Sequence, residues 1–354
     1  MCIKHSKGIP EPTLPFTSLF LERAKDKGYT NTVVNTVLGP VDSGQLGVTL
    51  ISESLMYVLP GAQYAYDIHI DRAACFDIIA ARLTQFREAG GGAIVDATGM
   101  FEGRDLRLYE ALSRETGVHI IASTGMGPEA MLGGYFLTPQ TNPPTPWSAQ
   151  KFAELFGQEV NNGMVVPRFE RRAAAGIIST ATTIDGMTPT DESLVRGAAR
   201  AAAAYGVPVR LRCGENALAE LQLAIGESLD PQRIVIADLD RRDAVKQGWP
   251  IAVAKAGALV AIDHIGANDP DYIDDVARVA LIQELIGAGF IDRILLSSSA
   301  TGVAFGTTGN DRPYSDVLTQ FVPMLLEADV APEHINQILI TNVARLLSVM
   351  GGDK

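Results

Sequence analysis

Strand-like and helix-like segments alternate along most of this 354-residue chain, and this alternation is the feature that most limits its fold. Apolar runs typical of buried strands lie at residues 48–54, 93–97, 119–123, 174–180, 207–212, 234–237, 259–262 and 293–297. Helical patterns follow them at residues 71–89, 105–115, 148–158, 191–205, 215–225, 241–256, 273–288 and 314–327. Eight such units predict a (β/α)8 TIM barrel rather than an open doubly wound sheet. No GxGxxG motif follows the first strand, so a dinucleotide-binding fold is not favoured.

The residues before the first barrel strand predict an extension of the barrel. An apolar segment at 32–38 is followed by Gly39-Pro40 and by a turn at Asp42-Ser43-Gly44. This order predicts an N-terminal β-hairpin that leads into the first strand. We therefore expect a leader at residues 1–30 and a single barrel domain at residues 31–354.

Charge and composition narrow the classes of partner. A net charge of -12 argues against nucleic acid and against an anionic membrane surface. No apolar run reaches the eighteen residues of a membrane span, and residues 1–13 do not resemble a signal peptide. Cys2, Cys75 and Cys213 show no pairing or CxxC spacing, which favours a reducing, cytoplasmic location. We expect a small-molecule substrate, and a homodimer is compatible with a barrel of this kind.

Polar residues gather where the predicted strands end, which is where barrel enzymes carry their chemistry. These strand ends hold Ser52, Glu53, Ser54, Asp96, Ser123, Thr124, Ser179, Thr180, Arg212, Cys213, Asp238, Asp263, His264, Ser297, Ser298 and Ser299. Because side chains alternate along a strand, Ser52 and Ser54 share one face while Glu53 faces a structural partner on the other side. By the same rule, Arg210 and Arg212 share a face.

The order and spacing of several motifs resemble those of the phosphotriesterase family, within the amidohydrolase superfamily. The similarity spans about residues 31–348 and rests on VNTVLGP at 34–40, GVTLISES at 47–54, Val95-Asp96, GRD at 103–105, TGVHI at 116–120, AGII at 175–178, GVPV at 206–209, DHI at 263–265 and TNVAR at 341–345. The resemblance implies a TIM barrel. In ordinary members it also implies a hydrolase whose two metal ions activate a bridging hydroxide against phosphoesters or lactones.

Every metal-ligand position of that pattern is changed in this chain. The resemblance places the paired histidines of the first strand at Ser52 and Ser54, and the bridging lysine at Ser179. It places two further histidines at Arg212 and Asp238, and an aspartate at Ser299. Hydroxyl groups are weak zinc ligands, and an arginine puts a fixed positive charge where a cation would bind. We therefore expect no binuclear metal centre and no cofactor. A mononuclear site built from Asp238, His264 and Cys213 is the alternative.

Charged residues at a barrel mouth predict a metal-independent reaction driven by proton transfer. We expect His264 to move a proton, while Asp238 either orients its imidazole or acts as the partner carboxylate. Arg212, with Arg210 below it, is expected to hold a carboxylate, a phenolate or a developing oxyanion. Arg210 has a competing role in an ion pair with an interior acid. Cys213 joins the substrate-contacting serines Ser52, Ser54, Ser179 and Ser299.

The resulting hypothesis is a lyase that breaks a C–C or C–O bond in a small aromatic or phenolic substrate, for example with loss of formaldehyde. One alternative is a metal-independent hydrolase of a lactone or ester, in which His264 activates water or Cys213 is the nucleophile. Another is a noncatalytic binding protein. Loops at 56–66 and 126–146, with Trp147 directly after the second, are candidates for a lid that accepts an aromatic substrate, or alternatively for a simple cap on the barrel. They carry Tyr57, Tyr64, Tyr66, Met126, Met131, Leu132, Tyr135 and Phe136.

Overall fold

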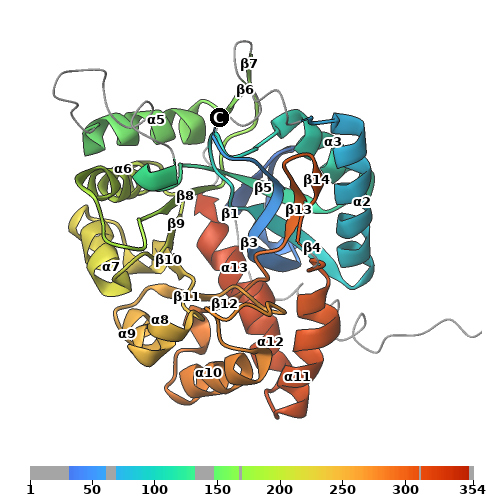
Figure 1. Cartoon of the computed structure of the whole chain (residues 1–354), viewed down its shortest axis with the longest axis vertical. Helices are drawn as coiled ribbons and strands as arrows, with labels where there is room; N and C mark the ends of the chain where they lie inside the picture. The colour runs from blue at the N-terminus through green and yellow to red at the C-terminus, as the bar shows by residue number, and fades with distance from the viewer. Residues whose placement is uncertain (1–31, 61–68, 132–146, 167–169, 311, 351–354) are drawn as a thin grey trace, which may run out of the picture.

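Eight parallel strands form the centre of the computed structural model, which describes residues 32–60, 69–131, 147–166, 170–310 and 312–350. They are β3 (Val48–Tyr57), β4 (Gly91–Asp96), β5 (His119–Thr124), β8 (Ile177–Ala181), β9 (Val209–Arg212), β10 (Ile234–Ala237), β11 (Leu259–Ile262) and β12 (Ile294–Leu296). Each strand pairs in parallel with the next one along the chain. This curled sheet, wrapped by helices in Figure 1, confirms the predicted barrel.

The eighth strand is split into two halves that pair with different neighbours. Its first half, β12, pairs with β11, and its second half, β13 (Thr301–Ala304), pairs with β3 and with the short β14 (Thr307–Thr308). The chain breaks between them, where Ser299 adopts a positive φ of 48°. Glu53 fills this gap, because its carboxylate accepts from Ser297 Oγ at 2.7 Å and from Ala300 N at 2.6 Å. The expected structural role of Glu53 is therefore confirmed.

Helices surround the sheet and begin close to the predicted positions. They are α2 (Arg72–Glu88), α3 (Leu106–Thr116), α5 (Ala149–Asn161), α6 (Pro189–Tyr205), α7 (Ala217–Gly226), α8 (Arg242–Lys246), α9 (Trp249–Lys255), α10 (Asp275–Gly287), α11 (Val322–Glu327), α12 (Pro332–Asn336) and α13 (Asn342–Leu347). Side-chain caps fix several of these starts, since Asp71, Asp105 and Ser148 each accept from backbone N–H groups of the first turn.

Two predicted helices are interrupted for identifiable backbone reasons. The helix expected at 241–256 is divided into α8 and α9, because Gly248 takes a left-handed φ of 70° and Pro250 starts the second piece. The helix expected at 314–327 begins with a π-helical turn, η5 (Val317–Phe321), before α11. A second π-helical turn, η6 (Gln337–Thr341), joins α12 to α13 at the end of the chain, where no helix was predicted.

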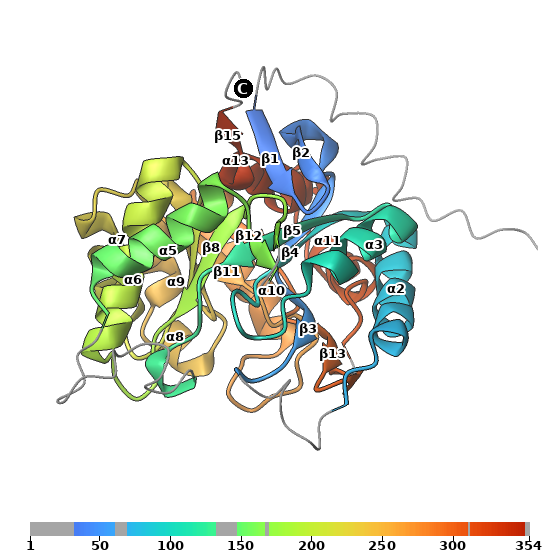
Figure 2. The same ribbon diagram turned by 90° about the horizontal axis from the view of Figure 1, so that it is seen from above.

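A small antiparallel sheet lies at the end of the barrel where the strands begin (Figure 2). It contains β1 (Thr32–Thr36), β2 (Gly39–Asp42) and β15 (Val349–Met350). The predicted hairpin is confirmed, but its turn falls at Val37 and Leu38, and Gly39-Pro40 belong to β2. The turn predicted at 42–44 is the 3-10 helix η1 (Ser43–Gln45). Shorter elements are β6 (Val165–Val166), β7 (Glu170–Arg171), η3 (Pro231–Arg233) and η4 (Ile291–Arg293).

Apolar side chains fill the inside of the barrel and the layer between sheet and helices. Inward-facing residues such as Ile51, Val95 and Leu295 form one buried cluster with part of α13, and a larger cluster joins the strands to the outer helices. Burial of this apolar surface is the main source of stability. Because apolar side chains fill the interior of the barrel, the polar groups that could act on a substrate lie at the carboxyl ends of the strands.

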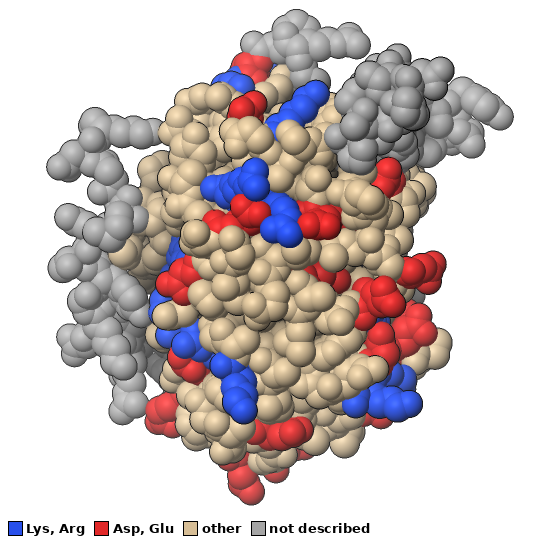
Figure 3. Space-filling model, turned by 90° about the vertical axis from the view of Figure 1, so that its left-hand side faces the viewer, with Lys and Arg blue, Asp and Glu red and all other residues tan. Residues whose placement is uncertain are grey.

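The outer surface carries charges of both signs. On the face formed by α5, α6 and α7, blue and red side chains lie side by side in Figure 3. Arg196 and Arg200, for example, both pair with Glu227 at 2.9 and 2.6 Å. This face therefore offers no continuous basic surface of the kind that nucleic acids need. Among the described residues, none of the helices combines the length and apolar character needed to span a bilayer.

Candidate active site

A cavity of about 280 Å³ opens at the carboxyl ends of the barrel strands. Arg212, Asp238 and His264 all line it, so the three residues predicted to carry the reaction do converge on one space. The remaining lining residues come from most of the strand ends: Ser52, Glu53, Ser54, Tyr57, Ala97, Thr98, Glu102, Met131, Arg210, Tyr272, Ser299 and Thr301. The volume suits a small molecule of limited size.

His264 follows β11 and is held in place from three sides. Its Nδ1 lies 3.1 Å from Asp240 Oδ1 and 3.6 Å from Asp263 Oδ1, and its ring stacks on Tyr272 with a centroid separation of 3.7 Å. Its backbone N–H also donates to Asp240 Oδ2 at 3.0 Å. With Nδ1 engaged, the ring presents Nε2 to the cavity, which gives this atom the position that proton transfer requires.

Asp240 was not among the predicted site residues, although it makes the closest side-chain contact to the imidazole of His264. It is fully buried and also accepts from Arg278 Nε at 2.7 Å. The available signal was only that Asp240 is a second carboxylate directly after the end of β10, two residues from Asp238. The sequence does not reveal that the second of the two carboxylates lies against the histidine Nδ1.

The charge of His264 is fixed by its carboxylate neighbours. Burial alone would lower its pKa, but the hydrogen bonds to Asp240 and Asp263 and the charges of both carboxylates raise the pKa of His264 to about 10. The imidazole is therefore protonated at neutral pH, and Nε2 carries a hydrogen. In this state His264 is a proton donor and a positive charge, rather than the base of an acid–base pair.

Asp238 provides the carboxylate that faces this donor. Its Oδ1 lies 4.0 Å from His264 Nε2, and its Oδ2 accepts from the Tyr272 hydroxyl at 3.4 Å. Its backbone is in the left-handed region, with φ of 61°, and its N–H donates to Asp263 Oδ1 at 2.9 Å. Burial raises the pKa of Asp238, while the positive charge of His264 opposes the rise. The geometry places Asp238 as a partner carboxylate at Nε2, and Asp240 in the orienting position.

Arg210 has the paired, interior role that was the competing expectation for it. Its Nη2 lies 3.1 Å from Asp263 Oδ2, and its Nε donates to Ser52 Oγ at 2.7 Å. Both partners of the ion pair are buried. Although burial opposes this, the hydrogen bond and charge of His264 and the charge of Arg210 hold the pKa of Asp263 well below its usual range. Arg210 therefore neutralises an internal carboxylate below the cavity.

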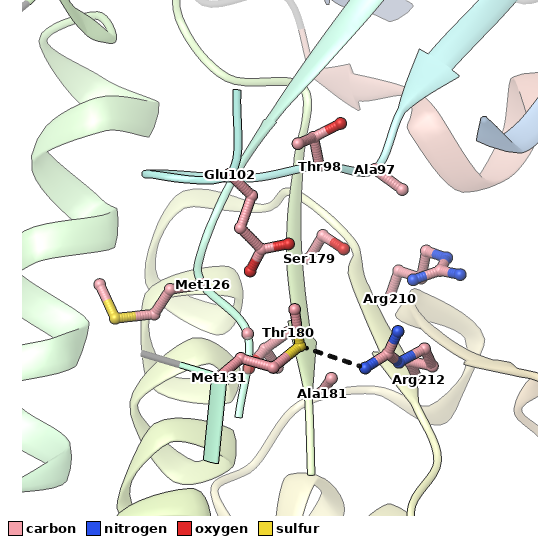
Figure 4. Close-up of a pocket in the computed structure, with 11 residues that line it drawn as sticks. Ala97, Thr98, Glu102, Met126, Met131, Ser179, Thr180, Ala181, Arg210 and Arg212 are labelled. Carbon is pink, nitrogen blue, oxygen red and sulfur yellow. Dashed lines mark hydrogen bonds between the residues drawn. The ribbon is translucent and has the colours of Figure 1, made fainter. Parts of the chain in front are cut away.

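Arg212 sits two residues further along β9 and lacks such a partner. It is half-buried, and its only hydrogen bond to a described residue is a long contact of 3.7 Å from Nη2 to the sulfur of Met131, drawn as a dashed line in Figure 4. Thioether sulfur is a weak acceptor. Most of the donors on this guanidinium are thus free to meet a ligand or water in the cavity.

A side recess of about 50 Å³ joins the cavity next to Arg212. Figure 4 shows Glu102, Ser179 and Met131 around it, and Glu102 is a residue that the sequence did not single out. Burial raises the pKa of Glu102 to about 7, against the lowering effect of the Arg212 charge. Glu102 lies in the loop after β4, where no periodic pattern marks functional residues, so sequence reasoning had no signal for it.

The serines predicted to contact substrate all line the cavity or the recess. Ser52, Ser54 and Ser299 line the cavity, with Ser54 Oγ lying 3.1 Å from Thr98 Oγ1, and Ser179 lines the recess. Cys213 is the exception. It is 1% exposed and does not line either space, because it belongs to the apolar cluster behind β9.

Burial raises the pKa of the Cys213 thiol well above its ordinary value, so the group is neither a thiolate nor accessible. The predicted contact of Cys213 with substrate is therefore wrong in this structure, as is its placement as a nucleophile.

The residues present do not fit a binuclear metal centre. Hydroxyls and a guanidinium replace the nitrogen and carboxylate ligands that such a centre needs. Asp238, Asp263 and His264 do offer ligand atoms within 4.8 Å of one another. However, Asp263 already pairs with the guanidinium of Arg210, whose positive charge would oppose a cation at this site.

Part of the expected lid can be placed. Tyr57 and Met131 line the cavity, and Met126 lines the recess, whereas Trp147 packs on Phe152 with a centroid distance of 5.6 Å. Tyr64, Tyr66, Leu132, Tyr135 and Phe136 lie outside the described residues.

Known proteins resemble this chain over most of its length. The family model described as "Phosphotriesterase family" matches residues 32–347. An N-acetyltaurine hydrolase from Tetraodon nigroviridis is 28% identical and covers 87% of this chain and 96% of its own length. A phosphotriesterase homology protein from Escherichia coli (strain K12) is 25% identical over 84% of this chain and 96% of its own.

The solved structures that resemble this chain are evidence for its fold and for nothing further. A variant of an organophosphorus hydrolase from Deinococcus radiodurans superposes with a TM-score of 0.78 at 24% identity, over 90% of this chain and 98% of its own. A mutant of a PTE-like lactonase from the same organism gives a TM-score of 0.75, also at 24% identity, over 89% of this chain and 99% of its own.

Proposed function

This chain belongs to the phosphotriesterase family, and from that premise we propose that it is a metal-independent hydrolase of a small lactone or ester. The observation that carries the proposal is the facing pair in the cavity, with Asp238 Oδ1 at 4.0 Å from His264 Nε2. A carboxylate base and an imidazolium acid at this separation can act on one water and one carbonyl group.

The proposed reaction begins with a water molecule that hydrogen-bonds to Asp238. Asp238 accepts a proton from this water as its oxygen attacks the carbonyl carbon, and the carbonyl π electrons move onto oxygen. His264 donates its Nε2–H to that oxygen and stabilises the developing negative charge. Collapse of the tetrahedral intermediate returns the proton of that oxygen to His264 Nε2, re-forms the C=O bond and breaks the bond to the alkoxy oxygen, which takes the proton from Asp238. The products are an acid and an alcohol, or one hydroxy acid from a lactone.

Supporting residues keep the pair in its reactive state. Asp240 and Asp263 maintain the charge of His264, and Tyr272 donates to the second oxygen of Asp238 at 3.4 Å. No step is assigned to a metal ion, because the donor set around Arg212 and the serines does not suit one. Arg212 is left to contact another part of the substrate.

The names of the relatives favour hydrolysis over the lyase reaction expected from the sequence. Both N-acetyltaurine hydrolase and the PTE-like lactonase are named for hydrolysis of an acyl bond. Nothing in the comparisons supports loss of formaldehyde or an aromatic substrate. A hydrolase is also a simple use of an acid and a base that line the same cavity and lie 4.0 Å apart.

Hydrolysis by purified protein tests the proposal directly. A panel of lactones and esters would be assayed by acid release, before and after treatment with a chelator, with metal content measured on the same sample. We expect turnover to survive chelation, metal to be far below one ion per chain, and His264→Ala to lose activity. Lys255→Met, on the exposed end of α9, is the control and should behave as wild type.

Stoichiometric zinc, iron or manganese together with loss of activity on chelation would overturn the metal-independent mechanism. Full activity in His264→Ala would overturn the role of the acid. If the protein hydrolysed no lactone or ester of the panel, but some of these compounds still bound to it and raised its thermal stability, the chain would be a binding protein instead.

A further inference from the structure

The recess beside Arg212 contains polar groups whose hydrogen-bonding capacity is unused. Glu102 is 9% exposed, and its Oε1 has no hydrogen-bond partner in the part of the chain that the structure describes, although the backbone N–H of Gly127 lies close enough to the carboxyl group to lower its pKa. Thr180, at 3% exposure, lines the same recess, and its Oγ1 likewise finds no partner among the described residues. Buried polar atoms are nearly always paired. Two unpaired ones in one small space indicate that something else binds there.

Arg212 adds a positive charge to the same space. Its guanidinium borders both the recess and the main cavity, and apart from the sulfur of Met131 it has no hydrogen-bonding partner among the described residues. It forms no direct ion pair with Glu102, which leaves room for a group between the two. A guanidinium presents parallel N–H donors that match the two oxygens of a carboxylate.

The other lining groups complete a set of donors. The Thr180 hydroxyl can donate, and so can Glu102 when it is protonated. A volume of about 50 Å³ holds a few water molecules or one carboxylate, but not a ring or a long chain. Since the recess shares Thr98 and Met131 with the main cavity, a molecule can occupy both spaces at once.

We propose that this recess binds a carboxylate group of the substrate, between the guanidinium of Arg212 and the side chains of Glu102 and Thr180. Combined with the proposed hydrolase activity, on which this step rests, it defines the substrate as an ester or lactone that carries a free carboxylate. The acyl bond to be cut would lie in the main cavity, beside Asp238 and His264.

The surroundings of Glu102 make this binding depend on pH. Burial has the largest effect and raises its pKa to about 7. Arg212, the backbone N–H of Gly127 and Arg210 lower the pKa, and Asp96 raises it. Tyr57 lines the adjoining main cavity, and its pKa is raised by burial and by the charge of Glu102. Above pH 7, Glu102 becomes an anion that repels a bound carboxylate.

Binding of simple ligands that are not hydrolysed tests the site without any turnover. Butanoate and butanamide have nearly the same shape and differ in charge, and their affinities can be measured by NMR titration at constant ionic strength. At pH 6 we expect butanoate to bind wild-type protein about tenfold more tightly than butanamide or better. Arg212→Met should remove this preference, and the control Lys255→Met should keep it.

A second variant keeps the test informative if Arg212→Met folds poorly. In wild type, butanoate affinity should fall as pH rises through about 7, the pKa to which burial raises Glu102. Glu102→Gln should abolish that fall, because the amide cannot ionise. Equal binding of butanoate and butanamide to wild type, or an unchanged preference in a folded Arg212→Met, would overturn the carboxylate site. Failure of the hydrolase panel would leave these binding results unaffected, so the two proposals can fail separately.

Discussion

The charged side chains on one side of the cavity are paired with one another, whereas those on the other side are not. On the side of β10 and β11, His264 is bonded to Asp240, which is bonded to Arg278, and Asp263 is paired with Arg210. We call this set of five residues the closed network. On the side of β9 and of the loop after β4, Arg212 and Glu102 have no comparable partners among the described residues, and we call these two residues the open wall.

Arg210 and Arg212 show the contrast within one strand. They lie two residues apart on the same face of β9, yet Arg210 meets a buried carboxylate at 3.1 Å while Arg212 meets only a thioether. A charge that the protein neutralises itself maintains structure and sets the pKa of its neighbours. A charge left without a partner at the edge of a cavity is available to a ligand. In the proposed function, the closed network therefore keeps the charge on His264, and the open wall is the part of the site that would contact the substrate.

The largest predicted effect concerns Asp238, the carboxylate that lies next to Nε2 of His264 at the edge of the closed network. Asp238→Asn should lower kcat by about 10²- to 10⁴-fold, because an amide cannot accept the proton of the attacking water. Asparagine tolerates the left-handed backbone at this position and can still accept from Tyr272, so the fold should be unchanged. Steady-state kinetics would measure kcat, and a thermal melt would show whether the fold is unchanged. A kcat close to that of wild type would remove Asp238 from the mechanism.

A matched pair of substitutions tests the comparison of the two arginines. Arg210→Met should destabilise the protein by about 3–5 kcal/mol, because it leaves Asp263 buried without its cation. Arg212→Met should change the free energy of unfolding by no more than about 0.5 kcal/mol, since no carboxylate loses a partner. Denaturant unfolding of both variants gives these values. Equal losses of stability in the two variants would show that Arg212 has a structural role, like Arg210.

Asp240→Asn should have a smaller effect on kcat and a diagnostic effect on its pH dependence. The hydrogen bond and charge of Asp240 help to raise the pKa of His264 to about 10, and His264 acts as an acid only below that value. In the variant, activity should therefore be lost at lower pH than in wild type, with kcat near neutral pH reduced by about 10- to 100-fold. A purely structural role would lower activity without moving the alkaline limb of the profile.

The sequence predicted the barrel and the position of its site because both depend on periodic patterns. Eight strand–helix repeats and the polar ends of the strands are visible in the sequence. The hairpin was also predicted, although its turn falls at Val37 and Leu38, before the expected turn residues. The break of the eighth strand at Ser299 was not visible, because it depends on Glu53 from a strand 244 or more residues away. Asp240 and Glu102 were missed for the same reason, since their roles depend on which side chains from other strands they meet.

A last prediction distinguishes the two sides of the cavity through the dependence of stability on pH. Burial raises the pKa values of Glu53, Glu102 and Glu220 to about 7, from an ordinary value of 4.5. Between these pH values the folded protein binds more protons than the unfolded chain. Stability is therefore highest near or below pH 4.5 as far as these groups are concerned, and it falls as pH rises through 7, by up to about 1.4 kcal/mol per pH unit for each group.

Substitution by glutamine should then act differently at the two carboxyls that line the cavity. Glu102→Gln should flatten the fall in stability and make the protein more stable at pH 8, because the uncharged amide replaces an anion whose Oε1 has no partner. Glu53→Gln removes the same ionisation but puts an NH₂ group among donors from Ser297, Ser298 and Ala300, so it should lower stability at every pH. Unfolding curves at pH 6 and pH 8 would measure both. If Glu102→Gln were as damaging as Glu53→Gln, Glu102 would belong to the structural charges, and the open wall would be reduced to Arg212 alone.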